Sequence, residues 1–228
     1  MKLASILLNG RGRYGLIYQD GLYMVRSEIE SKYATLKDLI ANLSAGDLID
    51  DCDPKVIPFE DFVFLPPIPV PEKIICVGMN YHKPYPIKGV KAPEPTNPVI
   101  FSRDCKTLVG HRVVLEIPPG EAAETFDFEG EIVAVIGKGG RFISKKNALD
   151  HVVGYSIMNE GSVRGWMKHS VHAGKNFYTS GSWGPWITTA DEIGNPEQLT
   201  IETRLNGNLI QSASASEMIF GVEDIIAY

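Results

Sequence analysis

The sequence has few cysteines, no excess of basic residues and no long apolar run. Its three cysteines, Cys52, Cys76 and Cys105, are widely spaced and odd in number, which favours reduced thiols over a disulfide framework. The net charge of −6 provides no basic excess to neutralise phosphates, so we expect no nucleic-acid partner. We find neither an 18-residue apolar run nor the pattern of a secretory leader, so we expect no membrane partner and a cytoplasmic location.

What the sequence does contain is enough apolar residues for one substantial core with a small appendage. Its 228 residues are 44% hydrophobic and 22% charged. Residues 65–71 include four prolines, which impose extended geometry and remove donors of strand hydrogen bonds, so this stretch is typical of a linker. We therefore predict a small N-terminal α+β domain at residues 1–70 and a second domain at residues 71–228.

The apolar pattern predicts a mostly β protein with short helices. The dipeptide Asn206-Gly207 predicts a tight hairpin turn between two strands. In the N-terminal part we expect strands at residues 3–8, 15–18 and 22–25, followed by an amphipathic helix at 33–43. In the second part we expect strands at 73–77, 99–102, 112–117, 128–136, 152–159, 185–189, 199–205 and 209–212, and short helices at 145–151, 163–170 and 217–228.

Carboxylates at the ends of two predicted strands are the main chemical feature. Glu129 and Glu131 lie two apart in a strand and therefore share one face of an otherwise apolar run. Glu160 ends the next predicted strand. Neighbouring buried carboxylates repel, and a divalent cation removes that cost. Oxygen ligands without Cys or His favour a hard ion, Mg²⁺, Mn²⁺ or Ca²⁺, over zinc.

Two alternatives to this carboxylate site remain open from the residues alone. Glu129 and Glu131 are also compatible with a solvated strand edge. His169 and His172, together with His151, are compatible with a transition-metal site if a helix continues through them. Gly174 predicts that this helix ends nearby, which favours solvated histidines at a helix end.

Nine short motifs follow one another between residue 73 and residue 228: ICVGMNY (75–81), FEGE (128–131), VIGK (135–138), VGY (153–155), NE (159–160), GKNF (174–177), GPW (184–186), LNG (205–207) and MIF (218–220). In sequence and in order, they resemble the motifs of the fumarylacetoacetate hydrolase family. The 2-hydroxyhepta-2,4-diene-1,7-dioate isomerase-like branch is similar in carrying Asn-Glu at positions 159 and 160.

The resemblance implies a fold, a reaction class and a metal. The implied fold is a mixed β-sandwich roll preceded by a small N-terminal domain, assembled as a homodimer. The implied activity is metal-dependent isomerisation, or C–C bond cleavage by hydrolysis or decarboxylation. The substrate would be a small 2-hydroxy-dienoate or 2-oxo diacid of aromatic-compound catabolism, and the metal Mg²⁺, or Mn²⁺ or Ca²⁺. The implied site residues are Glu129, Glu131 and Glu160 for the metal, Lys175 for catalysis, and Arg103, Arg164 and Thr179 for the substrate.

The sequence also departs from the family pattern. Glu160 stands where the family usually has Asp, and His82 lies two places before the histidine that pairs with a glutamate in hydrolytic members. Gly165 and Tyr178 replace two usual aspartates. These differences tilt the expected reaction from hydrolysis towards isomerisation or decarboxylation. A catalytically inactive family remnant that acts as a ligand-binding or scaffold protein is the alternative.

Two segments carry further expectations. The proline-rich, aperiodic residues 79–98 predict a loop that closes over the site. Residues 217–228 predict an amphipathic helix. The resemblance implies further strands after this helix, so the second domain is expected to be incomplete at its C-terminal end. The 228-residue chain alone would then be poorly soluble or oligomeric, and inactive.

Overall fold

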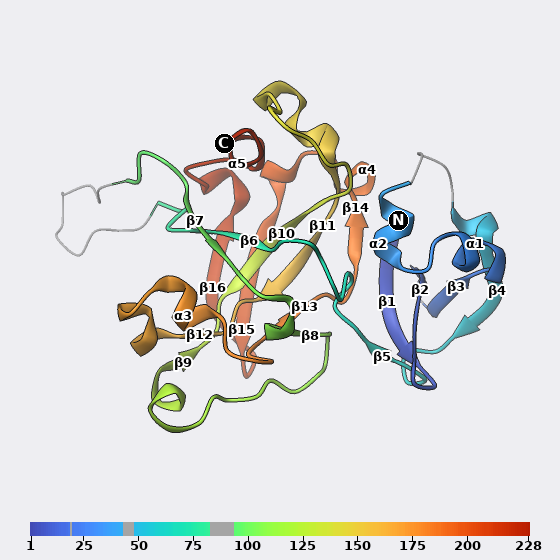
Figure 1. The fold of residues 1–228 in the computed structure, drawn as a ribbon, viewed down its shortest axis with the longest axis horizontal. Helices are drawn as coiled ribbons and strands as arrows, with labels where there is room; N and C mark the ends of the chain where they lie inside the picture. The colour runs from blue at the N-terminus through green and yellow to red at the C-terminus, as the bar shows by residue number, and fades with distance from the viewer. Residues whose placement is uncertain (19, 43–47, 83–93) are drawn as a thin grey trace.

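A computed structural model of the protein describes residues 1–18, 20–42, 48–82 and 94–228. It confirms the predicted mostly β fold with short helices. Figure 1 shows the N-terminal strands on the right of the view, and α3, β9 and β12 on the left. The strands are β1 (Lys2–Leu8), β2 (Arg11–Tyr18), β3 (Gly21–Val25), β4 (Cys52–Ile57), β5 (Val63–Phe64), β6 (Ile75–Gly78), β7 (Val99–Ser102), β8 (Leu108–Val109), β9 (Phe126–Asp127), β10 (Gly130–Ile136), β11 (Val152–Asn159), β12 (Ser162–Val163), β13 (Gly181–Trp183), β14 (Ile187–Thr189), β15 (Thr200–Leu205) and β16 (Asn208–Ser214). The α-helices are α1 (Ser27–Lys32), α2 (Leu36–Ile40), α3 (Val171–Lys175), α4 (Ala190–Ile193) and α5 (Val222–Ala227).

Ten of the described strands form one mixed sheet. Its main path runs β4-β3-β2-β1-β14-β11-β13-β8, and β10 and β5 pair with β11 and β1. Neighbours on this path are antiparallel except β13 and β8, which run parallel. Three two-stranded ribbons complete the described strands: β6 with β7, β9 with β12, and β15 with β16.

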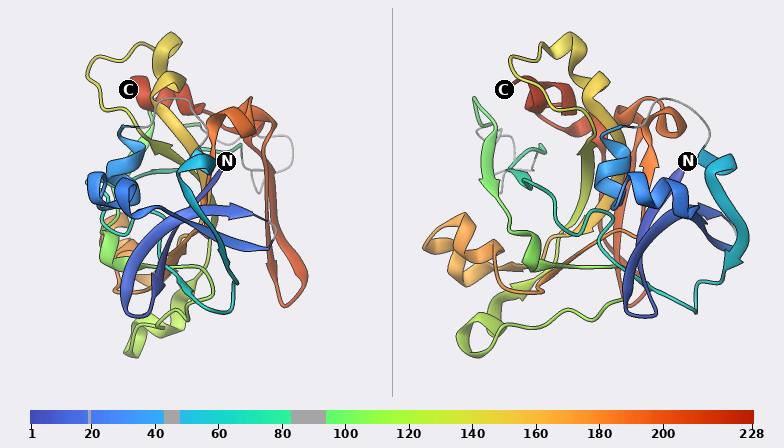
Figure 2. Two further views of the ribbon diagram at one scale, coloured as in Figure 1. Left: turned by 90° about the vertical axis from the view of Figure 1, so that its right-hand side faces the viewer. Right: turned by 45° about the vertical axis from the view of Figure 1, so that its right-hand side comes forward.

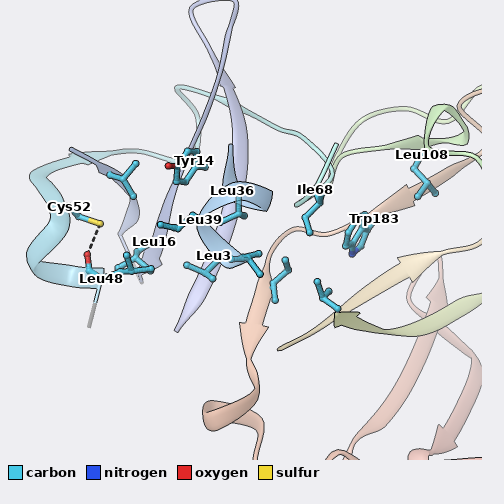
Figure 3. Packing of buried hydrophobic residues seen from close by; sticks show 14 of the residues in the cluster. Leu3, Tyr14, Leu16, Leu36, Leu39, Leu48, Cys52, Ile68, Leu108 and Trp183 are labelled. Atoms are coloured by element: carbon cyan, nitrogen blue, oxygen red, sulfur yellow. Dashed lines mark hydrogen bonds between the residues drawn. The ribbon is translucent and has the colours of Figure 1, made fainter. Parts of the chain in front are cut away.

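The sheet crosses the predicted domain boundary at residue 70. Strand β1 pairs with β14, with Leu3 opposite Ile187. Both side chains are almost fully buried and belong to one apolar cluster, which also contains Ile68, Leu108 and Trp183. Figure 3 shows labelled members of this cluster from both parts of the chain packed side by side. The division at residue 70 stays a prediction, because the two predicted parts share a sheet and a core.

The predicted helix at 33–43 is wrong in its extent. The chain forms α1 before that stretch and only the short α2 within it, separated by an extended segment. Thr35 is extended, accepts a hydrogen bond from Asp38 N, and completes a capping box with the Asp38 side chain. This cap starts a new helix at Leu36, which a pattern of apolar spacing alone does not reveal.

Two predicted elements of the second part are also wrong. Residues 112–117 form no strand: Arg112 has a positive φ of 63°, and Val114 is 85% exposed. The C-terminal helix begins at Val222 rather than at residue 217. Residues 218–220 are instead not helical and lie against Asn80, which accepts from Ile219 N through its backbone and from Phe220 N through Oδ1.

Other predicted helices are tighter turns. Residues 145–151 and 164–168 are 3₁₀ helices, Lys145–His151 and Arg164–Lys168. Figure 2 shows α5 beside the first of these turns, and Lys145 pairs with Asp224 across the contact. Among the described residues, no helix is long and apolar enough to cross a membrane.

Candidate metal and active site

The β10–β11 hairpin brings the three predicted carboxylates together at its open end. Gly130 is opposite Asn159 in the ladder, so Glu129 immediately precedes one strand and Glu160 immediately follows the other. A hydrogen bond of 2.7 Å from Glu160 N to Glu129 O fixes this spacing. One carboxylate oxygen from each of Glu129, Glu131 and Glu160 lies within 4.8 Å of the others. Three acidic side chains on two strand ends therefore converge on one point.

Lys175, the last residue of α3, reaches the same point. Its Nζ is 2.5 Å from Glu129 Oε2 and 2.8 Å from Glu160 Oε2, and its side chain is 3% exposed. Ser170 caps α3 by accepting from Ala173 N. Gly174 permits the helix to pack closely, because a Cβ there would collide with the Met167 side chain. These local features hold a buried ammonium against two carboxylates.

Arg164 connects Glu129 to a carboxylate that the sequence reasoning missed, Asp127. Arg164 Nε and Nη2 each lie 2.8 Å from Asp127 Oδ2, and Nη1 pairs with Glu129 Oε1. Burial raises the pKa of Asp127, but the Phe128 N–H and Arg164 outweigh it and hold that pKa below its ordinary value. The sequence spacing could have indicated Asp127 as a site residue, because Asp127 and Glu129 are two residues apart along an extended segment.

Arg103 is fully enclosed by protein. Its Nε donates to Thr107 Oγ1 at 2.8 Å, and Nη1 donates to the Gly161 carbonyl at 3.0 Å. Nη2 donates to Ser180 Oγ at 3.1 Å, while Nη1 lies 3.8 Å from Glu160 Oε1. In this arrangement Arg103 supports the turn that carries Glu160, and its predicted role in substrate binding stays a prediction.

Six side chains thus form a chain of alternating charge, which we call the charge chain. Burial raises the pKa of Glu129, but Lys175 and Arg164 outweigh it and hold that pKa below its ordinary value. Burial lowers the pKa of Arg103 more than the Glu160 charge raises it. The charge chain runs Asp127–Arg164–Glu129–Lys175–Glu160–Arg103.

The site lies in the part of the sequence that matches a known family. The family of the fumarylacetoacetate (FAA) hydrolase C-terminal domain matches residues 73–228. The chain belongs to the fumarylacetoacetate hydrolase family. The oxaloacetate tautomerase YisK of Bacillus subtilis is 34% identical over 99% of this chain and 82% of its own length. The human mitochondrial oxaloacetate tautomerase FAHD2B is 35% identical over 76% of this chain, and its matched part is only 55% of its own length.

Solved structures of this family share the whole described fold. A fumarylacetoacetate hydrolase from Exiguobacterium antarcticum superimposes with a TM-score of 0.80 at 28% identity, covering all of this chain and 80% of its own. A maleylpyruvate hydrolase from Sphingobium sp. SYK-6, in complex with manganese(II) and pyruvate, gives a TM-score of 0.77 at 24% identity, covering all of this chain and 81% of its own. At that identity the second likeness establishes the shared fold alone.

In this member of the family, the three glutamates fit a hard divalent ion. They offer only oxygen donors, the type that Mg²⁺ and Mn²⁺ prefer. Among the residues that the structure describes, no donor hydrogen-bonds to Glu160 Oε1, although this atom is buried. Its charged neighbour, Arg103 Nη1, lies 3.8 Å away and beyond hydrogen-bond distance, so this oxygen keeps a position in which a cation would be a suitable partner.

The remaining predicted residues lie around this family site. Thr179 has a positive φ of 47° and a buried Oγ1 for which the described residues supply no partner, and its contact with substrate stays a prediction. Burial and the Glu131 charge raise the pKa of Tyr81. His82 Nδ1 lies 2.9 Å from Glu94 Oε1, so His82 does have a carboxylate partner. Of the predicted loop at 79–98, residues 83–93 lie outside the described residues.

The three candidate histidines each contact a different residue and form no metal-holding group among the described residues. His151 Nδ1 contacts the Lys138 carbonyl, His169 stacks edge-on against Trp166, and His172 contacts Asn176. Within residues 1–18, 20–42, 48–82 and 94–228, the glutamates at 129, 131 and 160 are the one group of three side chains placed to hold a metal. This arrangement favours the carboxylate site over the histidine alternative.

Proposed function

We propose that this chain catalyses metal-dependent keto–enol tautomerisation of a small 2-oxo diacid, with oxaloacetate as the first substrate to test. The observation that carries the proposal is the position of Lys175 Nζ against Glu129 and Glu160, at 2.5 and 2.8 Å. A proton-carrying group and a cation site then lie at one point, which is what enolisation beside a carbonyl requires. The names of the two oxaloacetate tautomerase relatives support the same reaction.

Each charged side chain of the site would have a separate role in this reaction. A divalent ion at this site would supply Lewis-acid stabilisation of the negative charge that develops on the substrate oxygen. Glu129, Glu131 and Glu160 would hold that ion. In ketonisation, Lys175 Nζ would give a proton to the carbon next to the carbonyl while the enol hydroxyl releases its proton to solvent. In enolisation, both transfers would run in reverse. Arg164 and Arg103 would keep Glu129 and Glu160 in place, since each contacts one of them.

The tautomerisation of oxaloacetate tests this proposal directly. Its enol absorbs in the ultraviolet, so decay of the enol signal can be followed with wild-type protein plus Mg²⁺ or Mn²⁺. Glu131→Gln is expected to lose at least 100-fold in kcat/KM and to lose Mn²⁺ binding by calorimetry. The control is Glu197→Gln, which removes one negative charge from an exposed residue away from the site. It should leave kcat/KM and Mn²⁺ binding unchanged. Equal activity in wild type and Glu131→Gln would contradict the proposal.

The same assay can define the substrate class. The dienoate and diacid substrates of aromatic catabolism share the 2-oxo or 2-hydroxy acid group that the metal would chelate. Turnover of a 2-hydroxy-dienoate in preference to oxaloacetate would move the proposal to that class. Absence of turnover on every 2-oxo and 2-hydroxy acid, with metal bound, would favour the inactive ligand-binding alternative.

Hydrolytic cleavage is a second candidate, and one contact favours it. His82 Nδ1 and Glu94 Oε1 are 2.9 Å apart, the arrangement of a histidine that takes a proton from water while a carboxylate orients it. An acylpyruvate and its cleavage products, followed by chromatography, test this candidate. His82→Asn should abolish cleavage and spare tautomerisation if the two activities are separate.

The homodimer and the cytoplasmic location are also proposals. Light scattering coupled to size-exclusion chromatography tests the first, and a single-protomer mass would contradict it. Some relatives, such as human FAHD2B, are mitochondrial, so the cytoplasmic location needs its own test. Imaging of the tagged full-length protein in its own cells provides that test.

A further inference from the structure

The Lys175 ammonium contacts two of the three carboxylates that form the candidate metal site. Its Nζ contacts Glu129 Oε2 at 2.5 Å and Glu160 Oε2 at 2.8 Å, and the side chain is 3% exposed. A divalent ion binds carboxylate oxygens at about 2.0–2.6 Å. Two cations held by the same two carboxylates at such distances repel strongly inside a protein. Full contact of both cations with Glu129 and Glu160 is therefore unfavourable.

The lysine is the partner better able to move. Glu129 and Glu160 belong to the ends of paired strands and are tied by a 2.7 Å backbone hydrogen bond. Arg164 further holds Glu129. Lys175 carries its charge on a flexible four-carbon stem. The Phe101 ring, with its centroid 5.7 Å from Nζ, offers the ammonium a second favourable neighbour.

We infer that Lys175 competes with the divalent cation for Glu129 and Glu160 and thereby sets the metal affinity of the site. This inference rests on the proposed function, because it takes these glutamates as the metal ligands. Without metal, Lys175 compensates two buried carboxylates and stabilises the fold. When the ion binds, the ammonium gives up part of these contacts and becomes available to substrate. Metal loading and the readiness of Lys175 for proton transfer are thus coupled.

Metal binding by charge-neutral variants of Lys175 tests this coupling. Mn²⁺ binding is measured by calorimetry on the purified protein for wild type, Lys175→Met and Lys175→Gln. Lys168→Met is the matched control, because it removes the same charge from an exposed position on a neighbouring turn. We expect Mn²⁺ to bind about tenfold more tightly to both Lys175 variants, and the control to match wild type. Lys175→Gln retains N–H donors, so the test can still be read if the methionine variant fails to fold.

Thermal melting gives a second readout that does not depend on activity. Without metal, both Lys175 variants should melt below wild type, because two carboxylates lose their ammonium partner. Saturating Mn²⁺ should raise their melting temperature more than that of wild type. Unchanged or weaker Mn²⁺ binding in both variants would overturn the inference. Retained Mn²⁺ binding in Glu131→Gln would instead overturn the proposed metal site, so the two failures are distinguishable.

Discussion

At the scale of single residues, Asp127 holds the guanidinium of Arg164 in position beside Glu129. Two guanidinium nitrogens of Arg164 lie 2.8 Å from Asp127 Oδ2, and the third nitrogen, Nη1, pairs with Glu129. The other oxygen, Asp127 Oδ1, accepts from the Phe128 N–H at 2.9 Å. The hydrogen bonds of Asp127 reach the proposed metal site through Arg164 and Glu129, and we regard Asp127 as a positioning residue.

Asp127→Asn should weaken Mn²⁺ binding by about tenfold, the usual effect of losing a group that orients a metal ligand. The amide is neutral and holds Arg164 less firmly, so Glu129 loses part of its orientation. Asp150→Asn is the control, since it removes the same charge from an exposed residue outside the site. Calorimetry on both variants measures the effect. Equal Mn²⁺ affinity in the two variants would show that Asp127 has no such role.

The stability of the metal-free protein should decrease with acid through Asp127 and Glu129. Both have folded pKa values below their ordinary values of 3.8 and 4.5. Their stabilisation is therefore complete above the ordinary pKa and is lost as the pH falls through the lower folded pKa. Urea unfolding between about pH 5 and pH 3 measures this loss. Asp127→Asn should show a shallower decrease, and an unchanged pH dependence would contradict the assignment.

The sequence predicted part of this site because part of it is local. Period-two spacing placed Glu129 and Glu131 together, and strand order placed Glu160 at the neighbouring strand end. The enclosure of Arg103 and the link from Asp127 to Arg164 depend on how distant segments pack, and sequence spacing carries no measure of that. Lys175 was predicted from the family motif, while its burial against Glu129 and Glu160 came only from the fold.

At the scale of elements, the hairpin was predicted correctly because its signal is local. The segments that were predicted wrongly depend on contacts with distant parts of the chain. Asn206 and Gly207 have positive φ values of 51° and 83°, as the two central residues of a type I′ turn require. The dipeptide therefore predicted the turn between β15 and β16, while the apolar pattern predicted the two strands. Residues 218–220 carry an apolar pattern compatible with a helix, but hydrogen bonds to Asn80 hold them in a non-helical conformation.

Gly207→Ala should destabilise the protein by about 1 kcal/mol, because an alanine at positive φ is strained. A Cβ added at Gly207 would meet no atom of the described residues within 4 Å, so the cost comes from the backbone rather than from a collision. Gly139→Ala is the matched control: it has equal space and no positive φ, and should be near neutral. Chemical denaturation of both variants measures the difference. Equal stabilities would contradict the turn assignment.

At the scale of the whole molecule, the N-terminal part contributes to the same core as the strands behind the site. Leu3 on β1 and Ile187 on β14 are opposite each other, and both belong to the cluster that includes Met158 and Val135. Met158 is paired with Glu131 in the ladder between β10 and β11. Packing at residue 3 is therefore connected, through one continuous sheet, to the strands that carry the glutamates.

Residues 1–70 and 71–228 should consequently unfold together, in one cooperative transition. Leu3→Ala removes a side chain that is 1% exposed and should lower the free energy of unfolding by about 2–5 kcal/mol. Ile187→Ala should lower the free energy of unfolding by a similar amount, because the two residues face each other across the strand pair. It should also lower the temperature of the same single transition. Leu209→Ala, at a residue 50% exposed on β16, should change stability by no more than about 0.5 kcal/mol. Calorimetric melting of the three variants measures this. Two separate transitions, with Leu3→Ala moving only one of them, would show that the N-terminal part folds independently and that the shared sheet does not couple it to the site.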